Sequence, residues 1–265
     1  MRSQKLPPPR QVVRFLGASW LFDVKNLSQS LFFILVAAIQ PVIFATIGFF
    51  MFRAGERPGS LLYVALGAGL MGIWSSTLFG CGGIIQWERY QGTLEVLMTA
   101  PVPFVLVMIP ATLANASIGI YSLLATLLWG RVFFGVPFEL ADPLLFFIAV
   151  PVTIVSLGFM GLVIASTFIL YRNANALSNL LEYPVWLATG LIVPVALLPD
   201  WATPISWVLG PTWGMRAIRY SALGGDAVGP LLMTLALGAV YLVVGAIFLG
   251  HFERLARERA TLALT

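Results

Sequence analysis

The 265-residue sequence has few of the side chains on which enzymatic and metal chemistry depends. It contains one cysteine, Cys81, and one histidine, His251. A single cysteine excludes a disulfide within the chain and a metal site built from several cysteines. One histidine leaves little for proton transfer or zinc binding. We therefore expect no metal site and no cofactor held by this chain.

Charged residues are also scarce. Asp, Glu, Lys and Arg make up 10% of the chain and hydrophobic residues 59%, whereas a soluble domain carries about 25% charged residues. Such a chain cannot cover a water-exposed surface with charge, so its composition favours an integral membrane protein. The net charge of +4 is interpreted as positive charge in cytoplasmic segments, and no nucleic-acid partner is expected.

Catalytic motifs are missing as well. The only lysines, Lys5 and Lys25, do not follow a G-x-x-x-x-G-K-[ST] loop, so this chain does not bind ATP in that way. Neither G-x-S-x-G nor H-E-x-x-H occurs, and Leu223-Gly224-Gly225-Asp226 is one residue short of a G-x-G-D motif. The sequence predicts no catalytic residues, and hence a protein that is not an enzyme.

Long apolar runs are what the sequence has instead. A membrane-spanning helix needs roughly 20 predominantly apolar residues. Six runs meet this requirement and are uncharged apart from Glu182 in the fifth: 31–52, 61–86, 102–130, 143–171, 177–198 and 227–250. The first run is longer than the core of a signal peptide, about 7–15 residues, and is expected to be retained. We expect a single all-α integral membrane domain over residues 1–265.

The distribution of Lys and Arg predicts the orientation. With the N-terminus inside, five of the 15 basic residues lie outside: Arg53, Arg57, Arg131, Arg216 and Arg219. The other ten lie in the cytoplasm, as the positive-inside rule requires. We expect a multi-pass protein of the cell (inner or plasma) membrane with both termini in the cytoplasm.

Two segments outside the spans are predicted to lie at the membrane surface. In 10–30, apolar residues recur at spacings of three and four, which indicates an amphipathic interfacial helix. This helix either links the cytoplasmic side to the bundle or anchors it to the surface. In 199–226, tryptophans alternate with proline and glycine, so we expect re-entrant helices in the outer leaflet. Its candidate site residues either anchor the segment in lipid phosphates, the favoured reading, or contact a substrate headgroup: Trp213, Arg216, Arg219 and Tyr220.

Glu182 is the one ionisable residue expected inside a span. A charged carboxylate at the centre of a membrane costs about 2.5–3.5 kcal/mol. We place it about 10 Å from the cytoplasmic boundary, at 1.5 Å per residue. It is either functional or forms a structural hydrogen bond to a neighbouring helix or to another protomer. The many glycines of 61–86 are interpreted as close helix packing, in preference to a pore lining.

The charged segment 87–100 between the second and third runs is too hydrophilic to cross the membrane. We expect a short helix along the cytoplasmic surface, either a docking surface for a partner or an interfacial connection. Its residues Glu88-Arg89-Tyr90-Gln91-Gly92-Thr93-Leu94-Glu95-Val96-Leu97 resemble the E-R-x-x-G-T-L-E-x-L segment of type-2 ATP-binding-cassette (ABC) exporter permeases. Further resemblances lie in Tyr171–Ala176, Glu182-Tyr183-Pro184, Leu198–Trp201 and Pro211-Thr212, in the same order across the chain.

The resemblance implies an exporter of two permeases and two P-loop ATP-binding subunits, which would bind ATP and Mg. The second permease protomer would be identical or homologous, and membrane lipids would surround both. Segment 87–100 would be the coupling helix that docks on the ATP-binding subunit and transmits its movement to the permease. The implied contact residues are Trp87, Glu88, Arg89, Gly92, Thr93, Leu94, Glu95, Leu97 and Met98.

The expected function is ATP-driven export of a hydrophobic or amphiphilic substrate, drug-like or lipid-like, because the spans hold almost no charge. One alternative is export of a polysaccharide or a lipid-linked glycan. Another, from a different class, is a sensor or assembly subunit that binds an ATPase and transports nothing.

Overall fold

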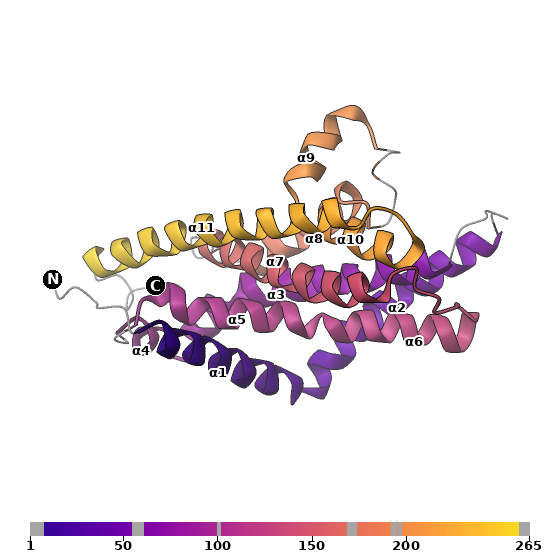
Figure 1. Ribbon diagram of the computed structural model, residues 1–265. Coiled ribbons are helices and arrows are strands. Elements are labelled where there is room, and N and C mark those ends of the chain that lie inside the picture. The colour runs from indigo at the N-terminus through magenta and orange to yellow at the C-terminus, as the bar shows by residue number, and fades with distance from the viewer. Residues whose placement is uncertain are drawn as a thin grey trace.

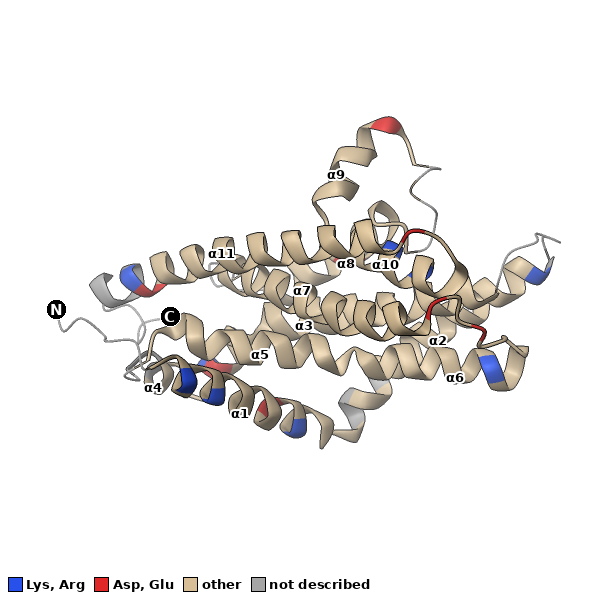
Figure 2. Cartoon of the chain, in the orientation of Figure 1, with Lys and Arg blue, Asp and Glu red and all other residues tan. Residues whose placement is uncertain are grey.

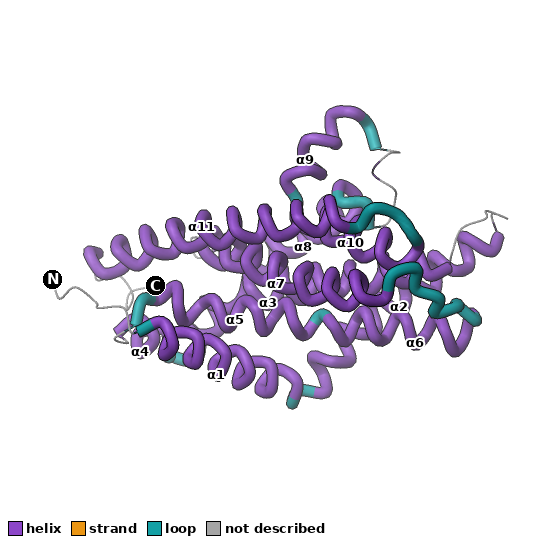
Figure 3. Tube along the Cα trace, in the orientation of Figure 1, coloured by secondary structure: helices purple, strands orange, loops and turns teal. Residues whose placement is uncertain are grey.

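The computed structural model describes residues 8–54, 61–99, 102–168, 174–191, 195 and 198–259. Within these ranges the regular structure is helical and no strand occurs, as Figure 3 shows. Helix is the expected result for an apolar chain, because backbone groups placed in lipid must form hydrogen bonds within their own segment.

Long helices run side by side in an elongated bundle (Figure 1). The helix α3 lies at its centre and contacts α2, α5, α6, α7, α8 and α10. The long bundle helices are α2 (Leu31–Ala54), α3 (Leu61–Tyr90), α5 (Phe104–Ile118), α6 (Ile120–Phe134), α7 (Pro143–Phe168) and α11 (Val228–Arg259).

Four stretches of the described chain are long and apolar enough to cross a membrane. These are Leu61–Tyr90, Phe104–Phe134, Pro143–Phe168 and Val228–Arg254. The helix α2 is 24 residues long, and within it the stretch Ala37–Arg53 is a further, shorter apolar helix among the residues whose side chains are described. The described part of the chain is thus all-helical with four candidate spans, and the six-span arrangement stays a prediction.

The fifth predicted span, 177–198, differs most from expectation. Its helix, α8 (Ala174–Ala188), has 15 residues and is about 22 Å long at 1.5 Å per residue, short of the roughly 30 Å of a bilayer core. Gly190 follows with φ +81°, a left-handed conformation that cannot continue a helix. Residues 192–194 and 196–197 lie outside the described chain.

The third predicted span, 102–130, consists of two helices that meet at Gly119. A Cβ atom at this position would lie 2.4 Å from the Cα atom of Ile73 in α3. Only glycine therefore allows the α5–α6 junction to approach α3 so closely. A Cβ at Gly72 would likewise lie 2.2 Å from the Cβ of Ser122. These contacts are the close packing of small residues seen between membrane helices.

The N-terminal helix α1 (Pro9–Ser28) packs against α5. Its Trp20 indole Nε1 donates to the Ser117 hydroxyl at 3.1 Å, and the Tyr121 hydroxyl donates to Ser28 at 3.1 Å. Proline occupies its first turn, where a missing amide hydrogen costs nothing. The amphipathic segment 10–30 is therefore helical up to Ser28 and is attached to the bundle through hydrogen bonds.

The described residues between α8 and α11 include the helices η2 (Asp200–Ala202), α9 (Thr203–Val208) and α10 (Gly210–Leu223). The helix α9 projects from the bundle in Figure 1, while α10 packs against α3, α7 and α11. Charged residues gather towards the two ends of the bundle and leave its middle largely free of them (Figure 2). We call these ends the α4 end, where α1 begins and α11 ends, and the α6 end, where α6 ends.

Candidate functional site

The turn between α3 and α4 is built by the residues of the E-R-x-x-G-T segment. Gly92 has φ +70°, which favours glycine. The amide of Thr93 donates to the Glu88 carbonyl at 3.0 Å, and the amide of Gly92 donates to the Arg89 carbonyl at 3.2 Å. This pair of hydrogen bonds is a Schellman motif. The Thr93 hydroxyl also donates to the Glu88 carboxylate, so these three motif residues, Glu88, Gly92 and Thr93, shape the turn itself.

The helix α4 (Leu94–Thr99) follows the turn and is fixed to the bundle by its apolar side. Leu94 is 3% exposed, and Leu97 packs against the same cluster. The other buried members come from α3, α5, α7 and α11: Ile85, Phe104, Met108, Leu162 and Leu249. Leu94 therefore anchors α4 and is not available to a partner in this conformation. The predicted helix 87–100 is in fact the last turn of α3 followed by a separate six-residue helix.

Other residues of this segment face outward. Trp87 is 60% exposed, Tyr90 85% and Val96 68%, and Arg89 is also exposed. We call these four residues the α4-end surface. The side chains of the predicted contacts Glu95 and Met98 lie outside the described residues. Exposed aromatic residues beside an arginine are typical of protein interfaces, where these residue types are enriched.

A second carboxyl group lies near this turn. Asp23 of α1 is half-buried, and burial together with the charge of Glu88 raises its pKa to about 6. Both causes act against the ionised form, because it loses water and meets a like charge. The interfacial helix and the α3–α4 turn are thus electrostatically coupled.

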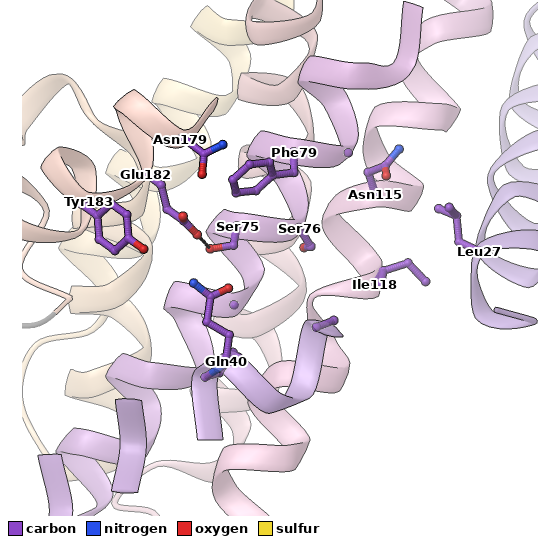
Figure 4. Close-up of a pocket in the computed structure, with 14 residues that line it drawn as sticks. Leu27, Gln40, Ser75, Ser76, Phe79, Asn115, Ile118, Asn179, Glu182 and Tyr183 are labelled. Atoms are coloured by element: carbon purple, nitrogen blue, oxygen red, sulfur yellow. Dashed lines mark hydrogen bonds between the residues drawn. The ribbon is translucent and has the colours of Figure 1, made fainter. Parts of the chain in front are cut away.

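A cavity of about 370 Å³ lies between α1, α2, α3, α5 and α8. It holds Glu182, which is 2% exposed. The Ser75 hydroxyl donates to the Glu182 carboxylate at 2.5 Å, and Gln40 interacts with the same group and points toward it in Figure 4. The remaining polar residues of the lining are Ser76, Asn115, Asn179 and Tyr183.

The position of Ser75 locates this carboxyl group along the bundle. Ser75 lies midway along α3 (Leu61–Tyr90), about 22 Å from either end at 1.5 Å per residue. Glu182 therefore lies beside the middle of a helix that is long and apolar enough to cross a membrane. An ionisable residue in such a place is a candidate functional group.

The candidates between α8 and α11 have separate environments. Arg219 is 7% exposed, and it donates to the carbonyls of Gly190 at 2.7 Å and Leu191 at 3.1 Å. Its guanidinium therefore forms hydrogen bonds with backbone carbonyls just after α8 and does not face lipid phosphates. Arg216 lies 4.9 Å over the ring of Trp213, and Tyr220 is 43% exposed.

Nothing in the described part of the chain forms a metal site: no group of three or more His, Cys, Asp or Glu side chains lies close enough to hold an ion. Cys81 is buried.

Sequence reasoning missed most of the cavity. Glu182 was found because it is charged inside an apolar run. Gln40 offered a weaker signal, since it is an amide within the first run. The sequence carries no comparable signal for the other polar residues of the cavity, because serine and asparagine are common in membrane helices and only the fold brings these four together: Ser75, Ser76, Asn115 and Asn179.

The model of one protein family, described as ABC-2 type transporter, matches residues 20–223. This stretch contains the α3–α4 turn, the cavity and Arg219. A comparison with curated proteins finds no match to the chain.

Proposed function

The chain belongs to the ABC-2 type transporter family, and from this premise we propose that it exports hydrophobic or amphiphilic molecules with energy from ATP. The family makes it the membrane-spanning permease of an ABC transporter, which works with an ATP-binding subunit. We propose that ATP is hydrolysed by two copies of that subunit, because this chain has no P-loop.

The observation that carries the proposal is the α4-end surface. Trp87, Tyr90 and Val96 are exposed at an end of the bundle where charged residues gather (Figure 2). Large apolar side chains that protrude beside Arg89 gain most when a protein partner covers them. We propose that the ATP-binding subunit covers this surface, with α4 and the end of α3 as the coupling element.

The attachment of α4 supports a mechanical role. The Schellman turn joins α4 to α3, and Leu94 joins it to α5, α7 and α11 through the buried cluster. A force applied to α4 is therefore passed to four bundle helices at once. A partner can shift the permease between two conformations only if its contacts differ between them, and this surface offers such contacts.

We propose further that two permease protomers, identical or homologous, enclose the transport path. The cavity is lined by Asn179, which is exposed, and by Tyr183, which is 52% exposed, so part of its lining lies at the surface of the chain, where a second protomer could meet it. Its volume of about 370 Å³ lies within the roughly 300–1,000 Å³ of pockets for drug-sized molecules. In the proposed orientation the α4 end is cytoplasmic, and so are both termini.

The test is co-purification with an ATP-binding subunit in mild detergent, with ATP hydrolysis of the complex as a second readout. Trp87→Ala is expected to reduce recovery of that subunit at least tenfold. The matched control is Trp201→Ala, because Trp201 is also largely exposed, at 74%, but lies in η2. This control is expected to leave recovery unchanged.

If both variants recover the same amount of the ATP-binding subunit, the α4-end surface is not its docking site. A permease that never recovers a P-loop ATPase from its native membranes would overturn the proposed function. A complex whose ATP hydrolysis no transported substrate stimulates would favour the sensor or assembly role instead.

A further inference from the structure

The cavity around Glu182 has an acidic lining. Of the described residues that line it, Glu182 is the only one with a charge, and none is Lys, Arg or His. Its polar neighbours are neutral hydroxyl and amide groups, of which Ser75 donates to the carboxylate. Neutral donors leave a negative charge on this carboxyl group without a counter-ion, and an unpaired charge away from water is costly. A bound cation would supply the missing counter-charge and so favour the ionised carboxylate.

Apolar and aromatic side chains complete the lining. Phe79 and Tyr183 stand on either side of Glu182 in Figure 4, and Pro41 and Ile118 line the same space. Aromatic faces attract cations through their ring electrons, by about 0.5–2 kcal/mol depending on desolvation. A ligand that fits must therefore combine a positive centre with apolar groups.

The cavity also joins helices that belong to different parts of the fold. Gln40 comes from α2, Ser75 from α3, Asn115 from α5 and Glu182 from α8. A ligand bound here contacts all four helices, including α3, which leads directly into the α4 turn. Binding that favours one arrangement of these helices would shift the permease toward it.

We propose that this cavity binds a lipophilic monovalent cation, with its positive centre beside the Glu182 carboxylate and its apolar groups against Phe79 and Ile118. The inference rests on the proposed function and names the substrate class of the exporter. Glu182 is then the residue that distinguishes a cationic from a neutral amphiphile of the same size.

The test measures binding of tetraphenylphosphonium to the full-length chain in lipid nanodiscs. Glu182→Gln is expected to weaken binding of this cation at least tenfold. Binding of the neutral analogue triphenylphosphine oxide is expected to change less than twofold. The control variant Glu139→Gln removes an exposed carboxylate from the loop between α6 and α7 and should leave both affinities unchanged.

A second variant keeps the proposal testable if Glu182→Gln does not fold. Asn179→Asp adds a carboxylate at the exposed rim of the cavity without removing any contact of Glu182. It is expected to tighten tetraphenylphosphonium binding several-fold and to leave the neutral analogue unaffected. If folded Glu182→Gln binds the cation as the natural chain does, Glu182 is a structural hydrogen-bonding group and the proposal is overturned. Unchanged cation binding by Asn179→Asp would also count against it.

The failure of this inference is distinguishable from failure of the proposed function. Binding to the chain alone tests the cavity, whereas co-purification of a P-loop ATPase tests the transporter. A complex whose ATP hydrolysis responds to neutral amphiphiles, but not to tetraphenylphosphonium, would keep the exporter and remove the cation. If the chain binds the cation through Glu182 but never recovers an ATPase partner, the cation site stands and the proposed transporter function falls.

Discussion

Arg219 shows how one residue can stabilise the segment that follows a short helix. Buried backbone carbonyls need a hydrogen-bond partner, and those of Gly190 and Leu191 lie just after the end of α8. The Arg219 guanidinium, on α10, donates to both carbonyls and also lies 3.4 Å from the centre of the Tyr63 ring. One side chain thereby connects α3, the end of α8 and α10.

Replacement of this arginine should destabilise the fold. Arg219→Ala leaves two buried carbonyls unpaired, so the free energy of unfolding should fall by about 3 kcal/mol. Thermal unfolding in detergent measures this change. Arg216→Ala is the matched control in the same helix, and it should cost at most about 1 kcal/mol, since it loses one cation–π contact. Equal losses for both variants would contradict the structural role of Arg219.

The raised pKa of Asp23 predicts that the stability of the fold depends on pH. Its pKa is about 6 in the folded chain against 3.8 as its ordinary value, so the folded state binds this proton more tightly than the unfolded state. The stability that the protonated group provides is therefore lost as the pH rises from about 4 through about 6. Asp23→Asn should raise the melting temperature at pH 7.5, and this gain should vanish near pH 4. A gain of the same size at both pH values would contradict the assignment.

At the scale of the elements, α3 packs closely against the α5–α6 junction. The junction approaches Ile73 so closely that the missing side chain of Gly119 is a requirement of the packing. Helices in lipid gain little from the hydrophobic effect between themselves, so contact of small residues contributes much of their association.

Gly119→Ala is accordingly expected to force α3 and the junction apart and to cost about 1–3 kcal/mol, the usual range for overpacking. Gly83→Ala is the control, because a Cβ there would meet Trp87 at an ordinary 3.6 Å and alanine favours helix more than glycine does. Thermal unfolding of the two variants measures the difference. If Gly119→Ala does not lower the melting temperature, α3 and the α5–α6 junction are less closely packed than the structure shows.

At the scale of the molecule, the separation of charge predicts how the chain lies in the membrane. Charged residues lie towards both ends of the bundle and are scarce in its middle (Figure 2). The positive-inside rule assigns the cytoplasm to the side with more Lys and Arg. Position 11, in α1, and position 139, after α6, are therefore expected on opposite sides.

This orientation can be measured with single introduced cysteines, which are labelled with a thiol reagent that cannot cross membranes. The native Cys81 is buried and should not react. Gln11→Cys should be labelled only in inside-out vesicles, and Glu139→Cys only in intact cells, because both positions are exposed on the protein. Labelling of both from the same side would contradict the predicted number of crossings between them.

The sequence alone determined the class of protein and its helical structure, because long uncharged runs can satisfy their backbone only as helices in lipid. It also identified the E-R-x-x-G-T segment, whose residues form a local turn. Tertiary structure decided which side chains share an environment. It placed Gln40, Ser75 and Glu182 at one cavity, ended α8 at Ala188 and turned Arg219 inward. Periodicity along a helix shows which residues share a face, but the neighbour that this face meets is set only by packing between distant segments.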